Sequence, residues 1–367
     1  MTITSDAVAP LIVVVGATGI QGGSVIRNLN QSPVKYRIRG ITRDPNSGKA
    51  EDLKRLGVEV VGVNIVPSNE PAVRAAFNNA DVVFGMTTIS WHNLSADVEE
   101  AQGKLIVEAA HAANTKLLVF SGLPNVTEQS GGKYTKVVLF DSKAKVVAYA
   151  RTLIPTIDVQ ASGYMSNIIN PQMGMRKVGN NQFIWPAPVA EQSIATRAYP
   201  SIDTATDYGL FVRHAIESWY EASCVVKQDT FLAFSENCTH EDVKGTLENV
   251  LEATVTLLGA PNDPEANRAK LAAMRLPPQA VDAMVDSVGY MAEFGYFFGA
   301  EEREEHLRTK TEVERRAGRA LRGWKDFIGD HKGRTLEHAA ERNPRPVRAS
   351  RTCAFLAKCK CLFNNIQ

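Results

Sequence analysis

Residues 11–29, LIVVVGATGIQGGSVIRNL, join a short apolar run to a glycine-rich turn and the start of an amphipathic segment. Gly16, Gly19 and Gly22 follow five consecutive apolar residues. Glycine lets a phosphate approach the backbone closely, and the free N–H groups and dipole of a helix N-terminus favour its negative charge. This order of strand, turn and helix is typical of the diphosphate-binding turn of a Rossmann fold. The alternative is a tight turn without a ligand.

Short β-rich runs alternate with amphipathic segments from residue 11 onward. Such alternation indicates βαβ units and predicts an α/β fold, a Rossmann doubly wound parallel sheet over residues 1–160. The expected strands are 11–15, 36–42, 58–63, 81–86, 116–121 and 155–160. The expected helices are 20–30, 49–56, 69–79, 95–113 and 139–152.

Glycine and proline interrupt this pattern after residue 160. We expect a smaller α+β domain over residues 161–330, which supplies the substrate side of an interdomain cleft. The charge-rich segment 301–316 alternates in sign, which is typical of a helix with a solvated face. The other elements expected in this half are helices at 205–217, 239–252, 264–275 and 278–294 and a strand at 230–234.

Residues 331–367 contain eight Lys or Arg and two Glu, whereas the rest of the chain has 33 basic and 38 acidic residues. We expect this basic tail to be disordered and solvated, with contact to a polyanion as the alternative. Three of the five cysteines, Cys353, Cys359 and Cys361, lie in it without a fourth ligand at zinc-site spacing. No metal site is expected there.

The overall charge of the chain is close to neutral, with a formal net charge of +1. It gives no reason to expect nucleic acid or an anionic membrane as a partner, so we expect a small-molecule substrate. The first residues include Asp6 and lack a basic region, and the apolar run 11–15 is too short to cross a bilayer. With an odd number of cysteines, these features predict a cytoplasmic protein without a transmembrane segment.

The end of the second expected strand, Ile41-Thr42-Arg43, indicates which nicotinamide cofactor is preferred. This position lies beside the adenosine ribose, where an acidic residue would bind the 2′-hydroxyl group. Arg43 instead offers a fixed charge and forked donors that suit a 2′-phosphate. The sequence therefore predicts NADP. A surface salt bridge between Arg43 and Asp44 is the alternative.

Five stretches carry a family resemblance: GATGIQGGSVIRNL at 16–29, GITRDP at 40–45, SGLPNV at 121–126, SGGKY at 130–134 and FDSKAKVVAY at 140–149. Together they resemble the NmrA-like family of atypical short-chain dehydrogenases, over about residues 11–330. The resemblance implies a Rossmann domain with a small C-terminal domain, NADP in the crevice, and either an oxidoreductase or a redox-sensing regulator.

The resemblance also implies which residues contact the cofactor. Arg43 would hold the 2′-phosphate, Lys143 would face the nicotinamide ribose, and Thr87 and Thr88 would line the adenosine side. Asn64 stands where members of the family commonly carry Asp, on the adenine side. The residues implied to surround the diphosphate are Gly16, Ala17, Thr18, Gly19, Ile20, Gln21 and Gly22.

The proton relay of typical short-chain dehydrogenases is incomplete in this sequence. Such enzymes place a Tyr four residues before the Lys, but Leu139 stands there. Related enzymes use a lone Lys, so Lys143 is the expected acid or base. The alternative is that Lys143 only binds the ribose and has no catalytic role. Ser121 is expected near the substrate. Tyr134 is a possible substitute donor. The residues expected to border the substrate are Trp91, His92, Tyr134, Tyr164 and Asn167.

Two functions follow from these expectations. The first is an NADP-dependent oxidoreductase that reduces a carbonyl or activated alkene of a small organic molecule, in specialised-metabolite biosynthesis as the fungal resemblance suggests. The second is a non-catalytic NADP(H) sensor that binds a regulatory protein partner according to redox state, which the missing Tyr favours.

Overall fold

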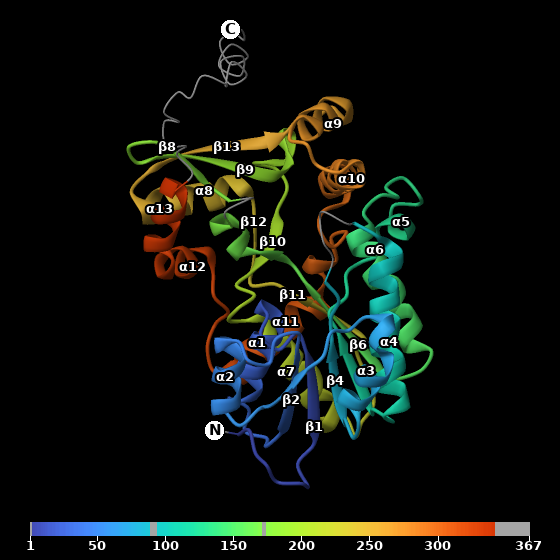
Figure 1. Cartoon of the computed structure of the whole chain (residues 1–367). Helices are drawn as coiled ribbons and strands as arrows, with labels where there is room; N and C mark the ends of the chain where they lie inside the picture. Colours follow the sequence, from blue (N-terminus) through green and yellow to red (C-terminus); the bar gives the residue numbers. More distant parts are fainter. Residues whose placement is uncertain (1, 89–93, 171–173, 342–367) are drawn as a thin grey trace, which may run out of the picture.

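The centre of the computed structural model, which describes residues 2–88, 94–170 and 174–341, is a seven-stranded parallel sheet (Figure 1). Its strand order is β11-β6-β5-β4-β1-β2-β3, and each neighbouring pair is parallel. The predicted Rossmann architecture is thereby confirmed. The strands are β1 Leu11–Val15, β2 Arg37–Thr42, β3 Glu59–Gly62, β4 Val82–Gly85, β5 Leu117–Phe120, β6 Thr156–Ala161 and β11 Thr230–Ala233.

Helices cover both faces of this sheet because the buried strands are apolar on both sides. Gly209 allows α7 to approach α1, since a Cβ atom there would lie 2.2 Å from the Ser24 carbonyl oxygen. One face packs against α1 Ile20–Leu29, α2 Gly48–Arg55 and α7 Tyr208–Glu221. The other packs against α3 Glu70–Phe77, α4 Ala96–Ala112 and α6 Val138–Arg151. The short helix α5 spans Val126–Gln129.

The sheet is completed by a strand from beyond the expected domain boundary at residue 160. Strand β11 pairs in parallel with β6, with Phe231 opposite Val159, and α7 covers the same sheet. The expected helix at 205–217 and strand at 230–234 therefore belong to the Rossmann layers rather than to the substrate side.

The smaller part of the chain contains two three-stranded sheets, which Figure 1 shows above the large sheet. Strand β9 is central to one of them although it contains Pro186 and Pro188, and proline is uncommon inside a central strand. The sheets are ordered β12-β10-β7 and β13-β9-β8, with β7 Gly163–Tyr164, β8 Arg176–Gly179, β9 Gln182–Ala190, β10 Tyr199–Ile202, β12 Glu236–Cys238 and β13 Thr254–Ala260.

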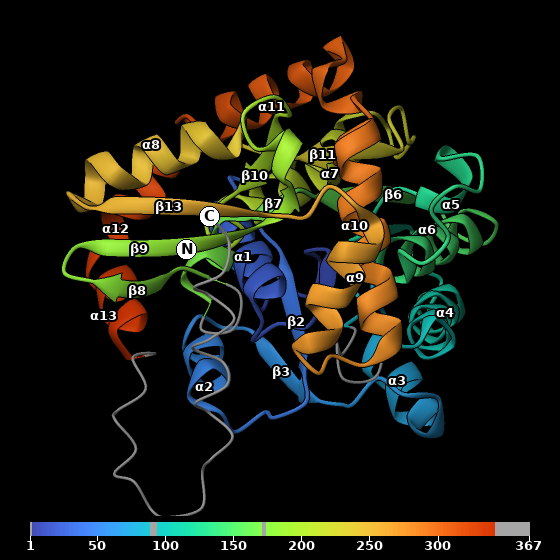
Figure 2. The same cartoon turned by 90° about the horizontal axis from the view of Figure 1, so that it is seen from above.

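Helices of the C-terminal half pack beside these small sheets, and Figure 2 shows α8 running along β13. Phe183, Trp185 and Leu247 form a core there with Trp324 and Phe327. The helices are α8 His240–Leu251, α9 Pro264–Ala273, α10 Pro278–Phe294, α11 Glu304–Ala317, α12 Trp324–Asp330 and α13 Lys332–Glu341. Short 3-10 helices span Pro67–Asn69, Met165–Ile169, Glu191–Ser193 and Ala300–Glu302.

One expectation for the C-terminal part was wrong for residues 332–341. The tail was expected to be disordered from residue 331, but α13 is helical and contacts α12 and β8. Residues 342–367 lie outside the described residues, as do the three tail cysteines. The expected charge-rich helix within 301–316 is confirmed as α11, whose solvated face carries Glu304 and Arg308. Its other face is buried at Thr309 and Val313, and Arg316 reaches two glutamates of α7. Within the described ranges, no helix is long and apolar enough to cross a membrane.

Candidate functional site

The predicted site residues follow different strands of the large sheet. Gly16 follows β1, Arg43 follows β2, Asn64 lies beyond β3, Thr87 follows β4 and Ser121 follows β5. Because all these strands are parallel, the residues lie along the same carboxyl edge of the sheet. The strand order reverses between β1 and β4, which is where ligands of such sheets bind.

The glycine turn at the start of α1 is tightly wound. Gly16 has a φ of +68°, and Gly19 donates its N–H to the Gly16 carbonyl oxygen at 2.8 Å. A Cβ atom at Gly22 would lie 2.3 Å from that same oxygen, so only glycine fits. No side chain of the described residues caps α1, and its first turn holds no acidic residue. Its first N–H groups are therefore suited to donate hydrogen bonds to a diphosphate.

The turn is also fixed to the neighbouring strand β2. Ala17 donates its N–H to the Ile41 carbonyl oxygen at 3.0 Å, and the hydroxyl groups of Thr18 and Thr42 lie 2.9 Å apart. Ile20 at the start of α1 is 48% exposed, although it is a large apolar residue. These contacts hold the glycine turn beside the end of β2.

Arg43 is exposed just after β2 and makes no ion pair within the part of the chain that the structure describes. Its neighbour Asp44 instead accepts a 3.0 Å hydrogen bond from the backbone of Asn46. The alternative of an Arg43–Asp44 salt bridge is therefore not seen. Asn64 is also exposed, and its carbonyl oxygen accepts a 3.0 Å hydrogen bond from the Asn69 side chain.

Gln21 connects the glycine turn to the end of β5. Its amide donates a 2.9 Å hydrogen bond to the Ser121 hydroxyl, and both side chains are buried. Ser121 also lies beside Tyr208, whose hydroxyl donates to the Val159 carbonyl oxygen at 3.0 Å. Burial raises the pKa of Tyr208 well above its usual range, and the hydrogen bond with Ser121 offsets only part of this rise. Tyr208 was not among the predicted site residues, because it lies 87 positions after Ser121 in the chain.

Asp158 lies next to this group and was also missed. Its carboxylate accepts hydrogen bonds from the Gly122 N–H at 2.9 Å and the Gln160 amide at 2.7 Å. Burial raises the pKa of Asp158 to about 7. An acidic residue inside a predicted central strand, Thr156–Ala161, was the available signal for it.

Lys143 on α6 points to a buried carboxylate. Its ammonium group forms an ion pair with Glu99 of α4 and donates to the Leu139 carbonyl oxygen at 3.2 Å. Glu99 is 1% exposed and also accepts a 2.6 Å hydrogen bond from the Thr87 hydroxyl. The N–H of Thr88 donates to Gln102 at 3.0 Å, so α4 holds both threonines. Sequence reasoning named Lys143, Thr87 and Thr88 but not Glu99.

The expected substrate residues differ in their surroundings. The hydroxyl of Tyr134 donates to Glu293 of α10 at 2.9 Å, and burial together with Glu293 raises the pKa of Tyr134. Tyr164 is in β7, where burial raises its pKa to about 12, and Asn167 is exposed. Trp91 and His92 lie outside the described residues.

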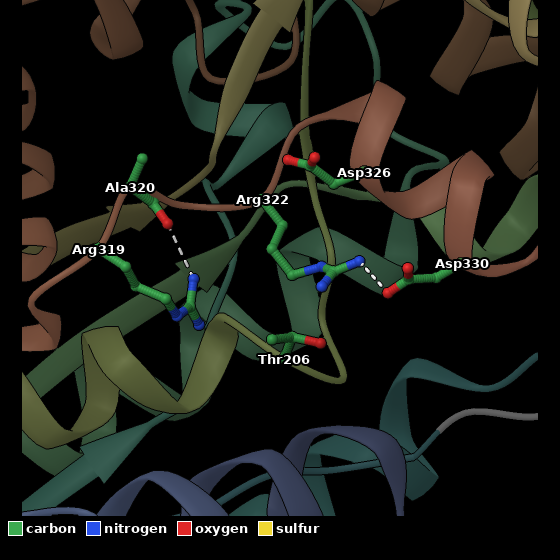
Figure 3. A pocket seen from close by; sticks show the side chains of 6 residues that line it. All are labelled: Thr206, Arg319, Ala320, Arg322, Asp326 and Asp330. Atoms are coloured by element: carbon green, nitrogen blue, oxygen red, sulfur yellow. Dashed lines mark hydrogen bonds and ion pairs between the residues drawn. The ribbon is translucent and has the colours of Figure 1, made fainter.

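A hollow of about 310 Å³ lies between the start of α7 and the segment that joins α11 to α12 (Figure 3). Arg322 points across it to Asp330 and forms an ion pair at 2.5 Å. None of the described site residues lines it. The lining residues are Thr206, Arg319, Ala320, Arg322, Asp326 and Asp330.

The fold and the residues at this sheet edge place the chain among the Rossmann-type α/β proteins. The sequence model of the NmrA-like family matches residues 9–322, and the chain belongs to that family. One relative is the NmrA-like family domain-containing oxidoreductase FrzB of Cladobotryum sp, 40% identical over 146 residues, which are 39% of this chain and 42% of that protein. Another, hkm9 of Aspergillus hancockii, carries the same description and is 33% identical over 44% of this chain and 49% of its own length. The chain thus matches less than half the length of these relatives.

Solved structures share the fold along most of the chain. The crystal structure of NmrA, described as a negative transcriptional regulator, has a TM-score of 0.70 and 21% identity, covering 91% of this chain and 98% of NmrA. NmrA has also been crystallised with NADP and with NAD. The triphenylmethane reductase of Citrobacter sp., in complex with NADP(H), has a TM-score of 0.60 and 15% identity, covering 90% and 99% of the two chains.

Proposed function

We propose that the chain is an NADP(H)-dependent oxidoreductase that acts on a carbonyl or activated alkene of a small organic molecule. The proposal rests mainly on one sheet edge, where the described residues leave the glycine turn uncapped and the exposed Arg43 without an ion pair. Lys143 of α6, with 14% of its side chain exposed, is connected to the same edge through Glu99 and Thr87. These are groups for a diphosphate, a 2′-phosphate and proton transfer, respectively. The fungal relatives named as oxidoreductases support the same assignment.

The residues at the sheet edge fit NADP(H). The N–H groups in the first turn of α1 would hold the diphosphate, and the Arg43 guanidinium would hold the 2′-phosphate. Thr87, Thr88 and Asn64 would line the adenosine side. NmrA crystallised with NADP or with NAD and the reductase with NADP(H) support a nicotinamide cofactor, and the choice of NADP(H) rests on Arg43.

When bound, NADPH supplies the hydride, which carries two electrons to the substrate. The Lys143 ammonium group donates the proton that completes the reduction, and the neutral amine takes a proton from water after the product leaves. The Ser121 hydroxyl, held by Gln21, orients the substrate near the end of β5. The substrate is proposed to belong to specialised metabolism, as the fungal relatives suggest, and the chain to act in the cytoplasm.

The cofactor assignment is tested by titrating the purified protein with NADPH and NADH while following nicotinamide fluorescence. We expect wild type to prefer NADPH. The variant Arg43→Asp should lose at least about tenfold in NADPH affinity, since a cation–phosphate contact becomes a repulsion, with NADH binding retained. Arg55→Asp changes another exposed arginine, on α2, and is the control. An unchanged ratio of NADPH to NADH affinity in Arg43→Asp would contradict the assignment.

The catalytic assignment is tested with a panel of ketones and enones. Turnover of NADPH by wild type, lost in Lys143→Ala with cofactor binding retained, is the expected result. Equal turnover in both proteins would overturn the role of Lys143.

A sensor without catalysis is the second candidate. It is favoured because Leu139 replaces the usual Tyr and because the Lys143 charge is already neutralised by Glu99. Its partner would be a regulatory protein. NADPH binding without turnover on the panel, together with a partner whose affinity differs between NADP and NADPH, is the result that supports it.

A further inference from the structure

We propose that Glu99 is the positioning residue for Lys143, and that Thr87 and the contact between α4 and α6 hold Glu99 in turn. This inference rests on the proposed NADP(H) site. The ammonium group of Lys143 has four rotatable bonds in its stem, so its place must be fixed by partners. In the structure those partners are the Glu99 carboxylate and the Leu139 carbonyl oxygen.

Glu99 reaches Lys143 because two helices touch closely. A Cβ atom at Gly103 of α4 would lie 2.3 Å from Cγ2 of Val146 on α6. Gly103 is one helical turn after Glu99, and Val146 is nearly one turn after Lys143, so the contact and the ion pair lie on the same helix faces. The missing Cβ of Gly103 therefore permits the approach that brings the carboxylate to the lysine.

The ion pair is placed where it stabilises the fold poorly. Glu99 is 1% exposed, and a buried ion pair gains little over apolar side chains of the same size. Its Oε1 atom accepts from both Lys143 and Thr87, while Oε2 is buried without a hydrogen-bond partner among the described residues. Thr87 follows β4 at the carboxyl edge. The pair thus connects α6 to the same edge as the glycine turn, which points to a role at the site.

The pair also accounts for how a site without the usual Tyr can hold its lysine. In the proposed reduction, one proton leaves Nζ for the substrate and Nζ remains as a neutral amine beside the Glu99 carboxylate. The carboxylate keeps the amine in place until it takes a proton from water. Glu99 therefore acts through Lys143.

The test compares Glu99→Gln with Glu100→Gln, because Glu100 forms a 2.8 Å ion pair with Lys145 between the same two helices. The first readout is the emission of bound NADPH, which reports the surroundings of the nicotinamide without turnover. Glu99→Gln should change this emission as Lys143→Met does, and the double variant should match Lys143→Met. Glu100→Gln should leave it as in wild type. Unchanged emission in Glu99→Gln would overturn the proposal.

The second readout is turnover. Glu99→Gln should lower kcat about 10- to 100-fold, with KM and NADPH affinity within about threefold of wild type. Glu99→Asp should recover part of kcat, because it restores the charge. Equal losses in kcat, NADPH affinity and thermal stability would show a merely structural role and overturn the proposal. If wild type binds NADPH without turnover, the catalytic assignment of Lys143 fails. The emission series then still decides whether Glu99 positions Lys143.

A third readout needs neither NADPH nor substrate. Lys143→Met leaves the Glu99 carboxylate buried without its cation, so the double variant with Glu99→Gln should unfold at a higher denaturant concentration than Lys143→Met. A double variant that is less stable than Lys143→Met would contradict the pairing.

Discussion

The amide of Gln21 donates a 2.9 Å hydrogen bond to the hydroxyl of Ser121, so the helix that starts at the glycine turn is tied to the end of β5. Both side chains are buried, with 6% and 4% of their surface exposed. A buried hydroxyl that loses its donor is no longer fully satisfied. The link therefore contributes to stability as well as to the position of Ser121.

We predict that Gln21→Met lowers the free energy of unfolding by about 1 to 2 kcal/mol, because the hydrogen bond is lost while the side-chain volume is nearly kept. Urea denaturation measures this. Gln129→Met, on the exposed end of α5, should change the free energy by less than about 0.5 kcal/mol. Equal effects of the two substitutions would show that the Gln21–Ser121 link carries no stability.

Gly22→Ala should disrupt the cofactor site without unfolding the chain. The new Cβ would lie 2.3 Å from the Gly16 carbonyl oxygen, so the glycine turn must shift. We expect NADPH affinity to fall at least about tenfold, since the first N–H groups of α1 move. Gly48→Ala is the control, because its Cβ would meet no atom within 4 Å. Normal NADPH affinity in Gly22→Ala would mean that this turn does not bind the diphosphate.

Much of the Rossmann sheet could be predicted because its signals are local. The run 11–15 and the glycines after it specify a strand, a turn and a helix within twenty residues. The place of β11 could not be predicted this way. The sequence of Thr230–Ala233 predicts a strand but not its neighbours, and only the pairing with β6 shows that it belongs to the large sheet. Strand β9 was not predicted, because Pro186 and Pro188 lack the N–H groups that a strand donates to its neighbours.

The candidate site was predictable in part for the same reason. Lys143 and Ser121 stand in recognisable segments, whereas Glu99 and Asp158 become visible only when helices and strands far apart in sequence meet. No periodicity shows that Gly103 brings α4 against α6. The roles given to the site residues stay predictions until the variants are measured.

Arg316 joins helix α11 to α7 and should contribute more to stability than the adjacent Arg315. It is 14% exposed and forms ion pairs with Glu217 at 3.1 Å and Glu221 at 2.5 Å. Arg316→Met should cost about 3 kcal/mol, because Glu217 is buried and loses one cation. Arg315→Met removes a 68% exposed arginine and should cost less than about 1 kcal/mol. Similar denaturation midpoints for the two variants would contradict this difference.

Asp158 should make the folded state less stable as the pH rises from about 4 to about 7. Burial raises the pKa of Asp158 to about 7 from its usual value of 3.8, so in this range the folded state keeps a proton that the unfolded state has lost. The free energy of unfolding therefore falls as the pH rises. The fall is at most about 4 kcal/mol, which is the free energy equivalent of the full pKa shift of Asp158.

The variant Asp158→Asn should lack this loss, because an amide does not titrate. Its stability relative to wild type should rise steadily between pH 4 and pH 7 and stay constant above pH 8. Burial lowers the pKa of His214 and of His240 to about 4, so these residues act in the opposite sense below about pH 6.5. Taking the difference between the variant and wild type at each pH removes their contributions. A difference that does not change with pH would show that Asp158 titrates near its usual value, and that burial is offset by the hydrogen bonds from Gly122 and Gln160.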